Sequence, residues 1–577
     1  MSSAAVERLG RLDRMVRFAA VSTQPLAGGR LSFGYCRAVH MERSEGEAVG
    51  GARGECRVLA GLFLLAVFVR TLAALRTSVI FGDGPIFISL ANDMGRGDWA
   101  AALLHPYHPL YPAAIWGVEH LTGAPEVAGV VLSVLAGGIS VVALYAFLRS
   151  AFDRRLARVG GVLLCVLPYA VRFSSDVQSD GVYLALFLWA VSQLWSSLAL
   201  GSKRSAFGAG VLSALAYLTR PEGVGVLVVG LILATEKGWR REWTASLALA
   251  WSGALCAGFA LIAGPYLLAL RSLRGAFVLS GKKSLSGLLG LADLPWAAAA
   301  AAGALLLVGL ALRVGARRRG LSGAGAPFGR AALVAVALAA CLGGVLFIPQ
   351  AREFSGVAFS SLGPSALLLV SLGLAGFPVA PSRPRARFLG VFLVLYALLL
   401  FGLLWNYGYL SRRHMLPPLT LLLGYAAAGV FVLARWLRRS LAHIPSIRPL
   451  SAGGSLVVVL LLVGATDLPK AWHRHREDAL AHRRAAEWLR GQGEPAGSLA
   501  SVKLRTAYYA GRDWVPLRPQ PNGAIAPREL RRARYLIVDR ETAGSLTEAS
   551  TLGLKELHRV EAAGKRVFVY RILRRDS

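Results

Sequence analysis

The stretch "RVLAGLFLLAVFVRTLAALRTSVIFGDGPIFISLANDMGRGDW", from Arg57 to Trp99, decides how this chain is organised. Its first half is an apolar run long enough to cross a bilayer as a helix. Its second half carries an acid, Asp83, between two glycines, three residues after that run ends. A short amphipathic helix is predicted to follow. The acid therefore stands where the chain leaves a membrane, and the rest of the sequence must show whether that position has a function.

The composition is that of a polytopic membrane protein. The chain has 577 residues, of which 55% are hydrophobic and only 17% are charged. Apolar runs of about 18 residues or more recur along it, as in proteins with several membrane helices. The net charge of +32 does not indicate nucleic-acid binding, because the basic residues cluster in short loops between apolar runs. The five cysteines form neither a disulfide framework nor a metal-binding spacing, and we expect no cofactor.

The distribution of Lys and Arg predicts the orientation in a bacterial inner membrane. Every second loop along the chain is rich in Lys and Arg. The loops between these hold far fewer, and the large loop 81–126 contains only Arg96. This pattern places the N-terminus in the cytoplasm, and an odd number of spans places residues 467–577 outside. We predict about thirteen spans, at residues 58–80, 127–148, 157–172, 181–200, 206–219, 223–235, 244–270, 295–312, 331–348, 364–378, 388–405, 415–434 and 453–466.

Three regions are expected. Residues 1–56 are polar and rich in Gly and Arg, so we expect a disordered cytoplasmic segment, with Met41 as an alternative start. Residues 57–466 form the transmembrane module. Residues 467–577 alternate polar helical stretches with short β-like runs ("SLAS", "RYLIVD" and "KRVFVYRIL"), which predicts a small extracytoplasmic α/β domain. The alternative for this last region is a disordered basic tail.

With this topology, the polar residues that interrupt the apolar runs gather on the outer face. Ionisable groups near membrane depth are costly unless they line a wet cavity, so their gathering predicts a site with both acidic and basic groups. The candidates are Asp83, His105, His108 and Tyr111 in the first loop, Asp176 and Asp180, Arg220 and Glu222, Lys282 and Lys283, and Arg412, Arg413 and His414. Pro106, Pro109 and Pro112 are expected to break any long helix in the first loop.

Most of these residues also have a structural interpretation. Asp176 or Asp180 could cap the following helix, Arg220 and Glu222 could form a structural ion pair, and His105 and His108 could be metal ligands or interfacial residues. Lys282 and Lys283 could be solvated, and Arg412 to His414 could anchor a helix at lipid headgroups. The structural alternative is weakest for Asp83, because a Gly-Asp-Gly turn at this place does not need an acid.

Five segments together resemble the GT-C superfamily of polytopic glycosyltransferases, in particular the branch with protein O-mannosyltransferases and lipid A aminoarabinose transferases. The segments are "DGPIFISLANDMGRGDW", "HPYHPLYP", "RFSSDVQSDGVYLALFLW", "ALAYLTRPEGVGVLV" and "YLSRRHMLPPLTLLLGYAAAG", and they cover about residues 58–435. The resemblance implies a GT-C-like fold and a polyprenyl-phosphate sugar donor. It also implies that Asp83 is the catalytic base and that Arg412 and Arg413 bind the donor phosphate, with Lys282, Lys283 and Arg220 as further candidates.

The sequence departs from the family at one motif and lacks another feature. Arg413 is followed by His414, where the family often has Arg-Tyr. The first loop has no clear Asp-X-Asp pair, so a metal-dependent mechanism like that of oligosaccharyltransferases has less support.

The leading hypothesis is an inverting glycosyltransferase that acts on the outer face of the membrane. An acceptor hydroxyl loses a proton as it attacks the anomeric carbon, and a carboxylate can take that proton. The sugar and the acceptor, which can be a lipid, a glycan or a protein, are left open. The alternatives are a transporter or flippase of a lipid-linked glycan and a non-catalytic scaffold. No inverted repeat or matching pair of broken helices favours transport.

Overall fold

The structure is a computed structural model that describes residues 45–275, 349–443, 450–518, 530–544 and 553–573. The predicted spans 295–312 and 331–348, together with Lys282 and Lys283, lie outside the described residues. Residues 1–44 of the predicted disordered segment lie outside the described residues as well.

The membrane region is helical, as predicted, and seven of the described helices are long and apolar enough to cross a bilayer. The predicted spans at 157–172, 206–219, 223–235 and 364–378 fall on shorter helices, so the count of thirteen stays a prediction. The helices of this region are α2 Glu45–Leu75, α6 Pro125–Ala151, α7 Arg154–Val166, α8 Pro168–Phe173, α9 Asp180–Leu200, α10 Lys203–Thr219, α11 Val224–Trp239, α12 Ala245–Arg274, α16 Pro349–Ser360, α17 Ala366–Gly376, α18 Arg383–Tyr407, α19 Arg412–Ala442 and α20 Ala452–Trp472, with the 3-10 turn η2 Pro221–Gly223 between α10 and α11.

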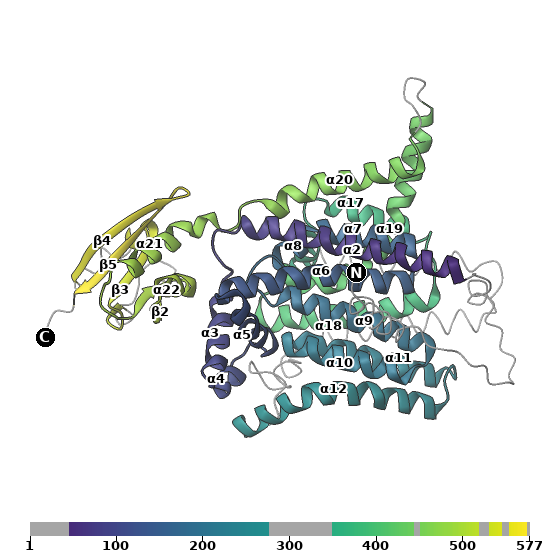
Figure 1. Cartoon of the computed structure of the whole chain (residues 1–577), viewed down its shortest axis with the longest axis horizontal. Helices are drawn as coiled ribbons and strands as arrows, with labels where there is room; N and C mark the ends of the chain where they lie inside the picture. Colours follow the sequence, from purple (N-terminus) through teal and green to yellow (C-terminus); the bar gives the residue numbers. More distant parts are fainter. Residues whose placement is uncertain (1–44, 276–348, 444–449, 519–529, 545–552, 574–577) are drawn as a thin grey trace, which may run out of the picture. The chain divides into compact units, whose positions relative to one another are not determined.

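Helices α6, α9, α10 and α12 pack side by side in that order (Figure 1). Glycines let α10 and α12 approach to backbone contact. A Cβ at Gly210 of α10 would lie 2.1 Å from the carbonyl oxygen of Leu255, and one at Gly258 of α12 would lie 2.1 Å from that of Phe207. Because α10 ends at Thr219, this contact also fixes the turn that follows it and carries two candidate site residues.

The first outer loop folds into three short helices, α3 Gly84–Gly95, α4 Trp99–Leu104 and α5 Leu110–Thr122. Helix α3 is the short helix expected after Asp83. The loop has no long helix, as the prolines predict. Pro106 and Pro109 lie in the break between α4 and α5, and Pro112 lies in the first turn of α5, where the missing N–H has no intrahelical partner to lose.

The C-terminal region contains a small α/β fold, as predicted. Its five strands have the order β2-β1-β3-β5-β4, with β1 parallel to both neighbours and β5 antiparallel to both of its own. The β-like runs of the sequence correspond to β1, β3 and β5. The elements are η3 Glu477–Ala479, α21 Leu480–Gly491, β1 Leu499–Ser501, α22 Leu504–Ala510, β2 Trp514–Pro516, β3 Tyr535–Asp539, α24 Arg540–Gly544, β4 Gly553–Ala562 and β5 Lys565–Leu573.

The segment that leads from α2 to Asp83 is held by the C-terminal region. The Ser78 backbone N–H donates to the His475 carbonyl (3.2 Å), and Arg483 donates to the Ser78 carbonyl (2.8 Å). The Ile80 N–H donates to the hydroxyl of Tyr509 (3.1 Å). Side chains of α3 and α5 also share one apolar cluster with α21, α22 and the sheet. The C-terminal region thus packs on the first outer loop.

We expect Gly210→Ala to lower the stability of the protein, since the new methyl group would overlap the Leu255 carbonyl oxygen. Overpacking of this kind costs about 1–3 kcal/mol. Gly208→Ala is the matched control on the same helix, because its methyl group would meet no atom within 4 Å. Thermal unfolding of both variants in detergent measures the difference. Equal melting temperatures would show that α10 and α12 are not in backbone contact.

We expect the C-terminal region to lie outside the cytoplasm, as the Lys and Arg distribution predicts. A C-terminal alkaline phosphatase fusion should then be active. A C-terminal green fluorescent protein fusion, exported unfolded, should be dark. An inactive phosphatase together with a bright fluorescent fusion would reverse the predicted topology.

Candidate functional site

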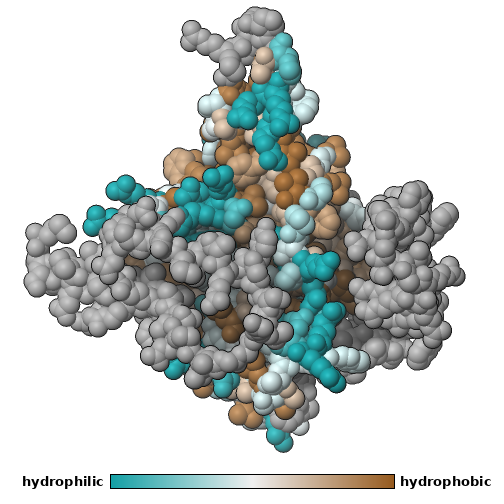
Figure 2. All heavy atoms as spheres, turned by 90° about the vertical axis from the view of Figure 1, so that its right-hand side faces the viewer, coloured by the Kyte–Doolittle hydropathy of each residue, from teal (hydrophilic) through white to brown (hydrophobic). Residues whose placement is uncertain are grey.

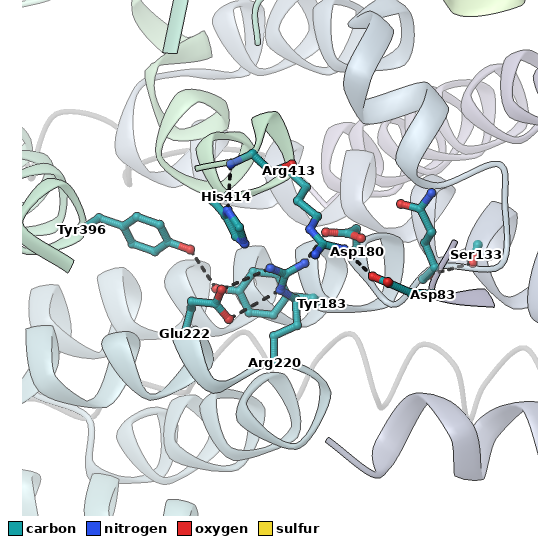
Figure 3. A network of polar contacts seen from close by, with 11 residues as sticks. Asp83, Ser133, Asp180, Tyr183, Arg220, Glu222, Tyr396, Arg413 and His414 are labelled. Carbon is teal, nitrogen blue, oxygen red and sulfur yellow. Dashed lines mark hydrogen bonds and ion pairs between the residues drawn. The ribbon is translucent and has the colours of Figure 1, made fainter. Parts of the chain in front are cut away.

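Asp83 lies at the start of α3, but its side chain does not cap that helix. The Asp83 carbonyl accepts the N–H groups of Ile86 and Phe87, and Pro85 has no N–H to satisfy. The carboxylate is thus available for another partner. It accepts a hydrogen bond of 2.8 Å from Nη1 of Arg413, which is 330 positions away in the sequence (Figure 3).

The Asp83–Arg413 ion pair is only partly covered. Exposed fractions of 22% for the Asp83 side chain and 18% for that of Arg413 leave the pair accessible to a ligand. The Nε atom of Arg413 is buried and has no hydrogen-bond partner among the described residues. A buried donor without an acceptor is costly, so an acceptor supplied by a ligand would be stabilising there.

Arg413 and His414 form the first turn of α19. The Nδ1 atom of His414 accepts the Ser411 N–H (3.2 Å), which fixes the start of the helix. His414 therefore has a structural role here.

Arg220 joins two carboxylates beside this pair. It forms an ion pair with Asp180, the first residue of α9, and a second with Glu222 (3.1 Å), as Figure 3 shows. Burial would raise the pKa of Glu222, but the charge and hydrogen bonds of Arg220 outweigh it and the pKa is about 2. Likewise, burial would lower the pKa of Arg220, but Glu222 and Asp180 raise it above its usual range. Arg220 and Glu222 thus stabilise each other's charged forms.

Tyr107 connects the two clusters. Its hydroxyl is hydrogen-bonded to Asp83, and burial together with the charge of Asp83 raises its pKa. The charges of Arg413 and Arg220 oppose this rise. The pKa of Tyr107 therefore depends on Asp83, Arg413 and Arg220 together. This dependence makes the two ion-pair clusters one electrostatic unit.

Two tyrosines close the side of the cluster away from Asp83. The hydroxyls of Tyr183 on α9 and Tyr396 on α18 lie 3.1 Å apart. The guanidinium of Arg220 lies over the Tyr183 ring, 5.6 Å from its centre. Both tyrosines are buried, so they limit the site with rigid and mostly apolar walls.

Asp176 was a candidate for substrate binding, but its oxygens already have partners. It pairs with Arg476 of the C-terminal region and accepts the N–H groups of Phe81 (3.2 Å) and Val177 (2.7 Å). Arg476 also donates to the Val79 carbonyl. Asp176 and Arg476 thus hold the segment directly before Asp83 and act as positioning residues. Neither Asp176 nor Asp180 caps α9, whose cap position is Ser179.

The candidates of the first loop other than Asp83 have separate environments. His105 accepts the Tyr107 N–H with Nδ1 (3.1 Å), while His108 is buried and its ring lies 4.9 Å from that of Tyr217. Tyr111 is buried, and its hydroxyl bonds the Gly129 carbonyl (3.0 Å). His105 and His108 are therefore not placed as a ligand pair, and no group of three or more potential metal ligands occurs in the described ranges.

Arg412 points elsewhere than Arg413. Its Nε donates to the hydroxyl of Ser360 (3.1 Å), and its guanidinium lies 4.9 Å from the centre of the Tyr169 ring. It is more exposed than Arg413, and in the described part of the chain it forms no ion pair with Asp83 or Glu222. The structure thus groups Asp83, Asp180, Arg220, Glu222, Arg413 and His414, and leaves Arg412 at the margin.

Four residues of this arrangement were not among the sequence candidates. Tyr107 stands in the quoted "HPYHPLYP", and Tyr183 lies one helical turn after Asp180, so both were within reach of the pattern. Tyr396 lies in a long apolar run and Arg476 in a basic tail, where nothing in the local sequence distinguishes them.

Comparison with known proteins agrees with this architecture. A family model described as dolichyl-phosphate-mannose-protein mannosyltransferase matches residues 104–267. A search of curated proteins gives no match. ArnT from Cupriavidus metallidurans, bound to undecaprenyl phosphate, has a similar structure, with a TM-score of 0.53, 14% identity, and coverage of 90% of this chain and 98% of that chain.

Two structures from Archaeoglobus fulgidus are also similar. The oligosaccharyltransferase in its apo form gives a TM-score of 0.51 at 14% identity and covers 90% of this chain and 74% of that chain. The oligosaccharyltransferase AglB, in complex with an inhibitory peptide and a dolichol-phosphate, gives 0.51 at 13% identity with the same coverage. The resemblance seen in the sequence motifs is thereby confirmed at the level of the fold: this chain is a multi-pass membrane protein with the GT-C glycosyltransferase fold.

Proposed function

We propose that the chain is a glycosyltransferase that moves a sugar from a polyprenyl-phosphate donor to an acceptor on the outer face of the membrane. The observation that carries this proposal is the Asp83–Arg413 pair: a carboxylate and a guanidinium, each partly exposed, meet at the membrane edge. Two of the similar structures contain undecaprenyl phosphate or a dolichol-phosphate, which supports a lipid-phosphate donor. The fold is also that of membrane glycosyltransferases.

The residues have distinct roles in this reaction. Asp83 takes the proton of the acceptor hydroxyl while the acceptor oxygen forms its bond to the anomeric carbon. The bond between the anomeric carbon and the phosphate oxygen breaks, and its electron pair stays on the lipid phosphate. Arg413 neutralises the charge that develops there, and Arg220 adds to the positive potential. A single displacement of this kind inverts the anomeric configuration.

Donor binding and activation of Asp83 are coupled in this scheme. Without a ligand, Asp83 and Arg413 neutralise each other. A donor phosphate that binds Arg413 competes with Asp83 for its N–H groups and weakens that pair. The released carboxylate is then a better proton acceptor. Tyr107, hydrogen-bonded to Asp83, keeps the carboxylate in place during this exchange.

We expect Asp83→Asn to fold and insert normally but to lose transfer activity by about 10²–10⁴-fold, the usual effect of removing a general base. Asp93→Asn is the control, because Asp93 lies on the helix that Asp83 precedes and, among the described residues, pairs only with the exposed Arg96. A transfer assay with reconstituted protein and a short-chain polyprenyl-phosphate sugar measures the effect. Activity of Asp83→Asn near that of the wild type would contradict the assignment of the base.

We expect Arg413→Lys to weaken binding of a short-chain polyprenyl phosphate several-fold and Arg413→Ala to weaken it much more. Lysine keeps the charge but lacks the planar fork that binds two phosphate oxygens. If Arg413 were only a headgroup anchor, lysine would serve as well as arginine. Binding of the lipid phosphate itself is measured, so that the sugar need not be known. Arg96→Ala, in the same loop as Asp83, is the control.

If neither Arg413 variant changes the affinity, the phosphate site lies elsewhere. Arg220, Arg412, Lys282 and Lys283 are then the next residues to test.

A further inference from the structure

A cavity of about 430 Å³ lies between α7, the turn that follows α17, α19 and α20, away from the site described above. Arg435 and Arg438 contribute to it from the end of α19 opposite Arg413. Along a helix, the 22 residues from Arg413 to Arg435 span about 33 Å. The cavity is therefore a separate site, at the helix ends where the predicted cytoplasmic loops begin.

The lining of the cavity has an excess of positive charge. It includes Arg155, Arg435 and Arg438 and a single acid, Asp153, which leaves two net positive charges (three minus one). Asp153 is occupied in capping α7, because one of its oxygens accepts the N–H groups of Arg155 (2.7 Å) and Leu156 (2.9 Å). None of the three arginines forms an ion pair with an acidic side chain in the part of the chain that the structure describes.

The rest of the lining is apolar, with Val379, Ala380, Phe431 and Ala434 among its residues. Helix α20, which forms one of its walls, and the end of α17 with the turn after it carry exposed large apolar side chains. They include Leu374 of α17, Phe377 and Val379 directly after it, and Val457, Val458 and Leu461 in α20. Hydrophilic and hydrophobic residues are interspersed on the face that Figure 2 shows.

The backbone beside this cavity is preformed by the packing of α17 on α19. A Cβ at Gly376 would lie 2.0 Å from the Tyr425 carbonyl oxygen, and one at Gly429 would lie 1.9 Å from that of Leu372. The two helices are thus in backbone contact close to the cavity, and Arg385 packs against the same region by donating to the Ala380 carbonyl (3.1 Å). A preformed cavity binds its ligand with little loss of conformational entropy.

We propose that this cavity binds the phosphate headgroup of an anionic glycerophospholipid. The three arginines contact the phosphate, and the acyl chains lie along the exposed apolar surfaces of α17 and α20. Basic pockets between membrane helices on the cytoplasmic side suit such headgroups, and arginine binds phosphate through parallel N–H donors. The apolar lining distinguishes this ligand from a soluble phosphate. The proposal does not depend on the proposed glycosyltransferase activity.

The test measures lipid binding by the full-length protein in detergent. Native mass spectrometry with phosphatidylglycerol compares the wild type with the triple variant Arg155→Gln, Arg435→Gln and Arg438→Gln. The matched control, Arg158→Gln, Arg204→Gln and Arg439→Gln, has the same change of charge at helix ends outside the cavity lining. We expect the cavity variant to bind phosphatidylglycerol at least about tenfold more weakly, and the control to bind like the wild type.

Two further ligands test whether the cavity recognises an anionic lipid headgroup, the acyl chains alone or a free phosphate. Phosphatidylcholine with the same acyl chains should bind more weakly than phosphatidylglycerol, and glycerol phosphate should not compete with the lipid. Equal loss in both triple variants, equal binding of phosphatidylcholine, or displacement by glycerol phosphate would each overturn the proposal. If the cavity variant does not fold, the single variants Arg435→Gln and Arg438→Gln replace it, and wild-type affinity in both would overturn the proposal too.

Discussion

The ion pair between Asp83 and Arg413 is the contact on which the candidate site of this protein depends. A single charge at the edge of a membrane is costly, whereas two opposite charges in hydrogen-bond contact offset each other. Here the two charges come from α3 and α19, which are 330 positions apart in the sequence at their meeting point. Their pairing therefore ties the first outer loop to the far part of the helical region and defines where the candidate site lies.

The same pairing of opposite charges organises the residues around Asp83 and Arg413. Arg220 is neutralised by Asp180 and Glu222, and Asp176 by Arg476. Each of these four acids is thus paired with an arginine, and Asp180 and Glu222 share one. The contacts of Asp176 and Arg476 with the chain before Asp83 show why a C-terminal region belongs to this architecture: without it, the segment that presents Asp83 would lose most of its polar anchors.

Sequence patterns predicted the helical membrane fold, the short helix after Asp83 and the β-strands of the C-terminal region, because each depends on local periodicity. They also indicated Asp83, Asp180, Arg220, Glu222 and Arg413, since ionisable residues at the ends of apolar runs are conspicuous. They could not tell Arg413 from Arg412, which are adjacent in sequence but point to different partners. Nor could they find Tyr396 or Arg476, whose importance arises only from tertiary contacts. Pro112 shows the converse: a proline is a strong local signal against a helix, yet the first turn of α5 accommodates it.

Helix α19 carries a charged region at each of its ends. At the end predicted to lie outside, Arg413 meets an acid of the protein itself, and the pair stays partly exposed. At the end predicted to lie inside, Arg435 and Arg438 have no acidic partner in the described residues, and the cavity beside them is lined by apolar side chains. Arginines at an inner helix end already serve to orient a membrane protein. A lipid phosphate at that end neutralises charges that orientation requires, so a lipid site there adds little unfavourable electrostatic energy to the fold.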